Sequence, residues 1–231
     1  MNKRLLSIRV FWLVLLVGVG SVSAQSGLGY SEQVYDFGHV GIDYQIFHEF
    51  KLFNSGVKPI KIDSLQVPCD CSTAQLLDST LHQGDTIRIR LMFNTKDFYG
   101  MTSKSLAVFT SDPLIPKLDF YYVSTIGQWL QGLKPDPISL FFLPGQQVKK
   151  VVLANKQFEK YTISVADQAN DFIQIRVLKA TVSKSGTGEV EVTADSKLQS
   201  GTYNTSFRLK ADVPELKAPI YLTIPVKIVR Y

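Results

Sequence analysis

Two cysteines one residue apart are the residues of this sequence best suited to chemistry. Cys69 and Cys71 flank Asp70 and follow Pro68. In an extended strand, side chains at positions i and i+2 share a face with Cα atoms roughly 6.5–7 Å apart, at the limit of disulfide reach. A local disulfide therefore requires a bend after Pro68 with Asp70 at its apex.

Two other interpretations of the cysteine pair stay open. Two thiolates on one face could bind Cu(I) or supply half of a zinc shell. Further zinc ligands would have to come from His39, His48 and His82, whose spacing shows no ligand pattern. The cysteines could also be free thiols, either buried or acting as a redox pair, although reactive cysteines usually lie at a helix N-terminus and no helical pattern follows here.

The rest of the sequence offers little for catalysis. The histidines have no nucleophile pattern nearby, the acidic residues are scattered, and no phosphate-binding glycine loop occurs. We expect His39 in a solvated turn, and His48 in a strand where it packs or hydrogen-bonds at the edge. The sequence therefore predicts a protein that is not an enzyme and that has no cofactor and no metal site.

Residues 1–24 have the form of a secretory signal peptide. Lys3, Arg4 and Arg9 precede an apolar run over residues 10–17, and small residues follow as far as Ala24. The run is shorter than the roughly 20 residues of a spanning helix. We therefore expect cleavage after Ala24, export to the periplasm or cell surface of a bacterium, and no membrane span in the mature chain.

The charge distribution argues against a nucleic-acid partner. The net charge of the chain is +5. Residues 1–24 have three basic and no acidic residues, residues 25–131 have eight basic and eleven acidic, and residues 132–231 have fourteen basic and nine acidic. A polyanion-binding surface needs clustered cations, whereas much of this excess belongs to the expected signal peptide.

Short alternating segments predict an all-β fold. Residues 87–93 and 205–211 alternate apolar with other residues at period two, and Gly-, Asp-, Asn- and Pro-rich turns separate such segments. A shift of 101 residues superposes the apolar phase of one half on the other and aligns Asn54 with Asn155. We therefore expect two tandem immunoglobulin-like sandwiches, at residues 25–131 and 132–231, joined by a proline-stiffened linker near residues 131–137.

Residues 30–127 contain several short motifs in a recognisable order. These are Val34-Tyr35-Asp36-Phe37-Gly38-His39-Val40, His48-Glu49-Phe50-Lys51-Leu52-Phe53-Asn54-Ser55-Gly56, Cys69-Asp70-Cys71-Ser72, Gln83-Gly84-Asp85-Thr86-Ile87, Gly100, Lys104 and Ser111-Asp112-Pro113. They resemble the bacterial exported family called domain of unknown function fifteen seventy-three, with Asp70, Ser72 and Gln83 replacing its Gly, Thr and Pro. The resemblance implies an Ig-like fold similar to hydin, abnormal-spindle and major sperm protein domains, and an exported location, but no activity.

A few further residues are candidates for interaction. Trp129 is expected in the last strand of the first domain, with a wedge between the domains as the alternative. Tyr121 could lie on the outer face of a strand where a partner could dock, but local packing is the favoured interpretation. Lys149 and Lys150 could attract anionic envelope polymers, or simply form a solubilising face.

These observations favour a structural or adaptor role. We expect a pair of Ig-like modules that presents loops or strand edges to another envelope protein, for instance by strand addition. The alternative is a redox or soft-metal (copper or zinc) handling protein that uses Cys69 and Cys71.

Overall fold

The computed structural model describes residues 26–130 and 133–231, which form strands connected by turns. The all-β class expected from the alternating segments is confirmed. The predicted signal peptide and its cleavage site lie outside the described residues. Within the described ranges, no helix has the length and apolar character needed to cross a bilayer.

The first sandwich packs two sheets around one cluster of buried side chains. One sheet has the order β1-β3-β7-β5, and the facing layer has the order β2-β9-β8-β4-β6. Ile87, Ile89, Leu91 and Phe93 of β7 all point inward and are buried, as the period of two requires. The bounds are β1 (Leu28–Tyr30), β2 (Val34–Val40), β3 (Gln45–Asn54), β4 (Ile60–Gln66), β5 (Ser72–Leu76), β6 (Thr80–Leu81), β7 (Thr86–Asn94), β8 (Gly100–Thr110) and β9 (Lys117–Ile126).

The second sandwich has the same strand order around a separate buried cluster. Its sheets run β10-β12-β16-β14 and β18-β17-β13-β15, and β11 pairs in parallel with β18 as β2 does with β9. The domain limits at residues 25–131 and 132–231 stay a prediction. The bounds are β10 (Pro135–Asp136), β11 (Leu140–Phe142), β12 (Val148–Ala154), β13 (Lys160–Gln168), β14 (Ile173–Lys179), β15 (Thr181–Ser183), β16 (Thr187–Ala194), β17 (Gly201–Asp212) and β18 (Ile220–Arg230).

Two buried asparagines occupy equivalent turns in the two halves. Asn54 ends β3 and Asn155 follows β12, and each side chain is 1% exposed. The Nδ2 group of Asn54 donates to the carbonyl of Leu81, and that of Asn155 donates to the carbonyl of Val182, in both cases 27 residues further along the chain. The alignment of these asparagines by the 101-residue shift therefore corresponds to one structural position.

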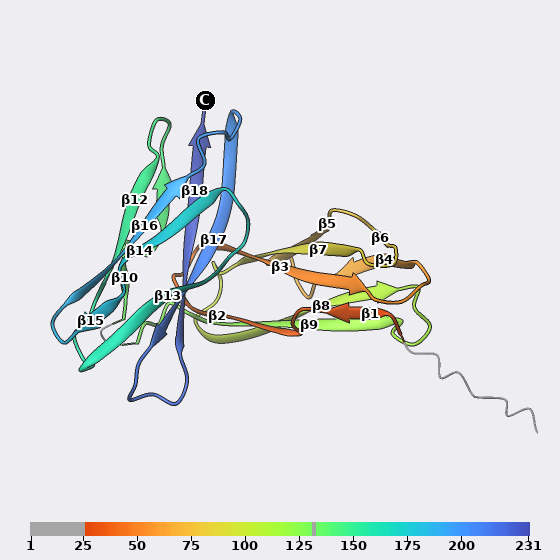
Figure 1. Cartoon of the computed structure of the whole chain (residues 1–231), viewed down its shortest axis with the longest axis horizontal. Helices are drawn as coiled ribbons and strands as arrows, with labels where there is room; N and C mark the ends of the chain where they lie inside the picture. The colour runs from red at the N-terminus through yellow and green to blue at the C-terminus, as the bar shows by residue number, and fades with distance from the viewer. Residues whose placement is uncertain (1–25, 131–132) are drawn as a thin grey trace, which may run out of the picture.

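The two sandwiches share a sheet through β18 and β2. These strands pair in parallel at Leu222 and His39, which joins the layers into one ten-stranded sheet. Gly38, at the bulge of β2, has a φ of 68°, and a Cβ atom there would collide with the backbone carbonyl of Tyr221. Glycine thus permits the close approach of the two strands. In Figure 1 the strands of the first sandwich run across the view, and β17 and β18 of the second cross that direction steeply.

The segment expected to be a linker belongs largely to the second sandwich. Leu133 is fully buried in the second core, and Pro135 and Asp136 pair with Leu153 and Val152 of β12. Leu133, Pro135 and Asp136 of the predicted linker therefore pack as part of the second sandwich, and Pro135 occupies the start of an edge strand, where the missing N–H is tolerated.

Candidate functional site

The two cysteines form a disulfide in the turn between β4 and β5. Their Cα atoms lie 5.1 Å apart, closer than the spacing of an extended strand, because the chain bends at the exposed Asp70. Two backbone hydrogen bonds support this bend: Ser72 N–H donates to the carbonyl of Cys69 (3.1 Å), and Asn94 N–H donates to that of Cys71 (2.8 Å). The chain thus adopts the bend that the disulfide interpretation requires. The redox state of the pair in solution stays a prediction.

The disulfide turn is attached to the first core by a buried hydroxyl pair. The hydroxyl oxygens of Ser72 and Tyr122 are 2.7 Å apart, and Cys71 packs half-buried against the core. Burial raises the pKa of Tyr122, although the hydrogen bond with Ser72 acts in the opposite direction. Across residues 26–130 and 133–231, no three His, Cys, Asp or Glu side chains gather as a metal ion would require.

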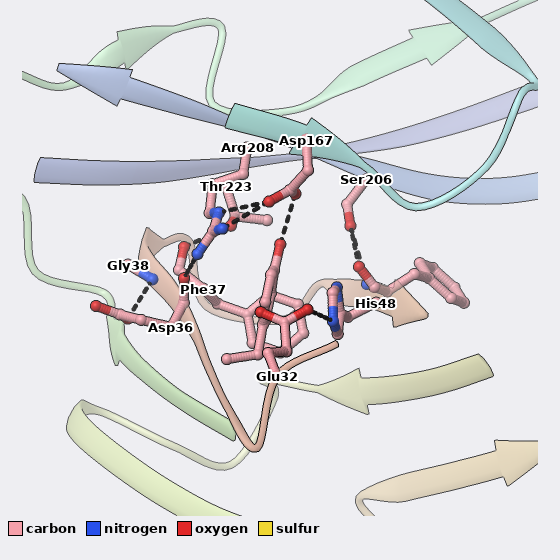
Figure 2. A network of polar contacts seen from close by, with 11 residues as sticks. Glu32, Asp36, Phe37, Gly38, His48, Asp167, Ser206, Arg208 and Thr223 are labelled. Carbon is pink, nitrogen blue, oxygen red and sulfur yellow. Dashed lines mark hydrogen bonds and ion pairs between the residues drawn. The ribbon is translucent and has the colours of Figure 1, made fainter. Parts of the chain in front are cut away.

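A second cluster of polar side chains lies at the junction of the two sandwiches (Figure 2). Tyr35 of β2 stacks on His48 of β3, with ring centroids 3.5 Å apart. The guanidinium carbon of Arg208, in β17, lies 4.1 Å from the centre of the same tyrosine ring. The Tyr35 hydroxyl donates to Oδ1 of Asp167, in β13, over 2.7 Å. One aromatic ring of the first sandwich therefore contacts both a cation and a carboxylate of the second.

Arg208 connects these groups. Its Nε and Nη2 atoms donate to Oδ2 of Asp167 at 3.0 and 2.6 Å, and Nη1 donates to the backbone carbonyl of Asp36 in β2. Its guanidinium also lies 4.3 Å from the ring centre of Tyr221. The side chain is only 13% exposed, so these contacts form in a largely desolvated place, where a paired charge is retained and an unpaired one is costly.

Hydroxyl groups of the second sandwich satisfy backbone groups of the first. Ser206 Oγ donates to the carbonyl of Phe47 (3.0 Å) and accepts from the Phe47 N–H (2.9 Å). Thr223 Oγ1 donates to the carbonyl of Phe37 (2.5 Å). Figure 2 shows Ser206 and Thr223 close to the Arg208–Asp167 pair. Side-chain contacts and strand pairing thus provide hydrogen-bond partners for buried polar groups of the junction.

The acidic groups of the junction each have a polar partner. His48 Nε2 lies 3.0 Å from Oε1 of Glu32. Burial raises the pKa of Glu32, but the hydrogen bond with His48 and the nearby positive charges outweigh it, and the net pKa is lowered. Burial and the Asp167 carboxylate hold the pKa of Tyr35 well above its usual range. At neutral pH the cluster therefore contains a carboxylate at Glu32 and an uncharged phenol at Tyr35.

The structure agrees with the expectation for His48 and contradicts the expectation for His39. His48 is buried in β3 and both packs and hydrogen-bonds, as expected. His39 lies at the end of β2 rather than in a solvated turn, and its Nδ1 atom is 2.8 Å from the carbonyl oxygen of Gln128. The turn expectation is wrong because Gly38 forms a bulge inside the strand instead of ending it.

Trp129 does not lie in the last strand of the first sandwich. That strand, β9, ends at Ile126, and Trp129 packs against the core of the second sandwich. It also faces His39 of the first sandwich, with ring centroids 6.5 Å apart. Trp129 therefore lies between the two sandwiches and not in β9, and its role as a wedge that fixes their angle stays a prediction.

Tyr121, Lys149 and Lys150 lie at the surface without forming a shared patch. Tyr121 is 42% exposed and pairs with the exposed Val34 of β2; a docking role for it stays a prediction. Lys150 forms an ion pair with Glu189 (3.2 Å), whereas Lys149 extends over the ring of Phe142. Neighbouring residues of a strand point to opposite faces, so Lys149 and Lys150 do not make a joint basic patch.

No sequence pattern identifies Tyr35, Asp167 and Arg208 as a group. Tyr35 and Asp167 are 132 residues apart, and Asp167 and Arg208 are 41 residues apart. Asp167 also follows a β-bulge that shifts the register of β13, and this shift leaves no mark in the alternation. The group is created by the contact between the two sandwiches, which local sequence does not encode.

Solved structures similar in fold include bacterial and animal proteins. A protein of unknown function from Porphyromonas gingivalis W83 is 12% identical, covers 88% of this chain and 99% of its own, and has a TM-score of 0.36. A PapD-like domain of human CEP192 is 11% identical (54% and 99% covered, TM-score 0.39), and the MSP-domain protein SSP-19 of Caenorhabditis elegans is 18% identical (42% and 99% covered, TM-score 0.35). At these identities the likenesses concern the fold alone. No curated protein matches the sequence.

One family model matches part of the chain, within the first sandwich. Residues 28–118 match the family described as "Protein of unknown function (DUF1573)". This range contains the cysteine turn, the Asn54 turn and the glycine bulge of β2. The first sandwich thus carries the sequence pattern of the DUF1573 family, and the resemblance drawn from its motifs is confirmed.

Proposed function

We propose that the protein is exported and serves in the bacterial cell envelope as a non-enzymatic adaptor. Its two Ig-like sandwiches act as one rigid body that presents strand edges and loops to other envelope proteins. The observation that carries the proposal is the junction, where Arg208 binds Asp167 and the Asp36 carbonyl while β18 pairs with β2. Export is supported by the residues of the N-terminal segment.

A junction of this kind is unusual for domains that move independently. Contacts between domains are by default small and permit relative motion. Here a shared sheet, an ion pair in which Nε and Nη2 of the largely buried Arg208 both bind Oδ2 of Asp167, and the packing of Trp129 all connect the sandwiches. Fixing the angle reduces the conformational entropy lost when a partner engages both sandwiches, and this is an advantage for an adaptor.

The same contacts support a non-enzymatic role. Glu32 is engaged by His48, and Asp167 is engaged by Arg208 and Tyr35. General acid–base catalysis needs a group free to exchange a proton with a substrate, whereas these groups stabilise one another inside the junction.

A test compares two arginines with the same ion-pair geometry. Arg208→Met removes the junction pair, and Arg176→Met removes an exposed pair in which Nε and Nη2 bind Glu191 at 3.2 and 2.7 Å. Spin labels, one in each sandwich, report the distance between the sandwiches, and quantitative mass spectrometry reports partners captured from envelope extracts. We expect Arg208→Met to broaden the distance distribution and reduce specific capture about tenfold, and Arg176→Met to change neither.

Two results would oppose the adaptor. Repeated failure of the wild-type protein to capture any envelope protein would refute the adaptor function itself. Undiminished capture by Arg208→Met despite a broadened distance distribution would show that a fixed angle is not needed.

The second candidate function is redox or soft-metal handling at the half-exposed Cys69–Cys71 pair. It predicts a mixed disulfide with a client protein or stoichiometric copper or zinc. The intact mass of the exported protein, measured with and without reduction and alkylation, distinguishes the candidates. A stable oxidised form about 2 Da lighter than the reduced form, with neither metal nor adduct, would favour the structural disulfide.

A further inference from the structure

We infer that the free edge of β5 is the docking edge of this protein, and that it takes an extended segment of a partner in which apolar residues alternate with acidic ones. The inference rests on the proposed adaptor function and names its site and its ligand. Four features of the first sandwich carry it: the free backbone groups of β5, the absence of charge along it, a half-buried apolar strip beside it, and a cationic face next to it.

The backbone of β5 has unused hydrogen-bonding groups. Among the described strands, β5 is the last in its sheet and pairs only with β7. The bond from Asn94 N–H to the carbonyl of Cys71 sets the alternation, so Thr73 and Gln75 bond to β7 and Ala74 and Leu76 direct their N–H and C=O groups away from it. An added strand would use these groups.

The disulfide turn defines where this edge begins. The N–H of Ser72 donates back to the carbonyl of Cys69 and so offers nothing to a partner. The first N–H available beyond the turn on the outer edge is that of Ala74. The cysteine pair therefore fixes the position at which an added strand can start.

The repeat supplies an internal comparison. Strand β14 occupies the equivalent edge of the second sandwich, and the 101-residue shift aligns Ala74 with Ile175 and Gln75 with Arg176. Strand β14 contains Arg176 and Lys179 and has a register shift before Lys179, and such charges and bulges block edge pairing. Strand β5 has the sequence Ser-Thr-Ala-Gln-Leu, without charge and without a register shift. One edge is protected and its counterpart is open.

A strip of half-buried apolar side chains lies on the β5 side of the first core. Its members pack against the core without being covered; they are Leu65 and Val67 from β4 and its end, Cys71, and Ala74 and Leu76 from β5. A strand added to β5 would place every second side chain over this strip. Apolar residues at those positions would remove the strip from water.

The outer face beside β5 is cationic. On the outward faces of β3 and β7, Lys51, Arg88 and Arg90 lie beside one carboxylate of these strands, Glu49, which binds Arg90 at 2.9 Å and Arg88 only at 3.8 Å. Glu32 and Asp171 line the same hollow. Gln75 of β5 pairs with Arg90. The side chains of an added strand that face outward would lie next to these cations, so acidic residues fit this side.

The probe is a fluorescent nonapeptide of alternating valine and glutamate, titrated into the exported protein. Binding is measured by anisotropy, and hydrogen exchange with mass spectrometry locates the protected amides. Wild-type protein is expected to bind saturably, with new protection in residues 73–77.

The matched variants are Ala74→Pro and Ile175→Pro. Each removes an N–H that points away from the neighbouring strand, so pairing with β7 or β16 is kept. Ala74→Pro is expected to weaken peptide binding at least tenfold, and Ile175→Pro less than twofold. Arg88→Glu leaves the β5 backbone intact. It is expected to weaken binding of the valine–glutamate peptide and to strengthen binding of a valine–lysine peptide.

Several outcomes would overturn the inference. These are absence of binding, equal binding by Ala74→Pro, protection outside residues 73–77, or dimers of the protein that form through β5 and so make a second copy the occupant. If Ala74→Pro is misfolded by circular dichroism, the Arg88→Glu charge exchange decides. If wild type and Ala74→Pro capture envelope partners equally, docking at the β5 edge is refuted but the adaptor function is not. If no partner is captured, the adaptor function itself is refuted.

Discussion

The buried asparagine that closes a turn in each sandwich can be removed to test what holds each half together. In Asn54→Ala, three hydrogen bonds are lost: Nδ2 no longer donates to the carbonyls of Lys58 (2.8 Å) and Leu81 (3.0 Å), and Oδ1 no longer accepts from Gly56 N–H (2.9 Å). Each such bond contributes about 1 kcal/mol net. We expect the free energy of unfolding of the first sandwich to fall by about 3 kcal/mol, or roughly 10–20 °C in Tm for a domain of this size.

Asn155→Ala is the matched change in the second sandwich. There Nδ2 donates to the carbonyls of Phe158 (2.9 Å) and Val182 (3.2 Å), and Oδ1 accepts from the N–H groups of Gln157 and Phe158. A loss of about 3–4 kcal/mol is expected on the same reasoning. Asn54→Asp should be worse than Asn54→Ala at neutral pH, because it directs a buried carboxylate at two carbonyl oxygens.

Hydrogen exchange measured peptide by peptide in denaturant separates the two halves. Asn54→Ala should accelerate exchange in β3 and β7 more than in β12 and β16, and Asn155→Ala should do the reverse. A loss below about 1 kcal/mol in both variants would refute the role given to the asparagines. Equal acceleration across the whole chain by either variant would show that the halves unfold as one unit.

Two further changes test the junction. Gly38→Ala forces a Cβ atom against the carbonyl of Tyr221 at a φ of 68°. We expect the free energy of unfolding, measured by denaturation, to fall by about 3 kcal/mol or more, and spin-label distances to show disrupted β2–β18 pairing. Wild-type stability and distances in this variant would contradict the close approach of the two strands. Glu32 has a lowered folded pKa, so its contribution is present above its unfolded pKa and is lost as pH falls through the folded value. Glu32→Gln should therefore lower the free energy of unfolding by about 0.5–1 kcal/mol at pH 7, a small amount because the group is partly exposed. This difference in stability from wild type should shrink toward pH 3. A difference that does not change with pH would exclude a contribution from the ionised Glu32 carboxylate.

Much of the fold follows from local sequence. The inward phase of Ile89, Leu91 and Phe93 fixes the register of β7 relative to the core, since a one-residue slip would expose all three. Asn54 is recognisable because a polar residue that follows an alternating strand and precedes Ser55-Gly56 is typical of a turn. Such features need only a few neighbouring residues to specify them.

The junction could not be predicted in this way. Arg208 lies in a strand whose alternation explains its neighbours, and nothing local distinguishes it from an exposed cation such as Arg176. Its partner across the bulge, Asp167, is out of the simple phase of β13. The position of Trp129 likewise depends on where the second core lies, because β9 ends three residues earlier. Contacts between preformed units depend on surface shape, which one-dimensional periodicity does not record.

The shortness of β11 has a consequence for assembly. Strand β2 has seven residues and β11 has three, so β11 covers only residues 226–228 of β18 and leaves room near Leu222 for β2 of the other sandwich. Head-to-tail contacts between similar units close into rings or propagate into open filaments. In the first sandwich, however, the strand equivalent to β18 is β9, whose edge is already occupied by its own β2. In this joint β2 is therefore the donor strand and β18 the acceptor. Because β2 already covers the edge of β9, the first sandwich offers no equivalent acceptor edge from which the joint could be repeated into a polymer.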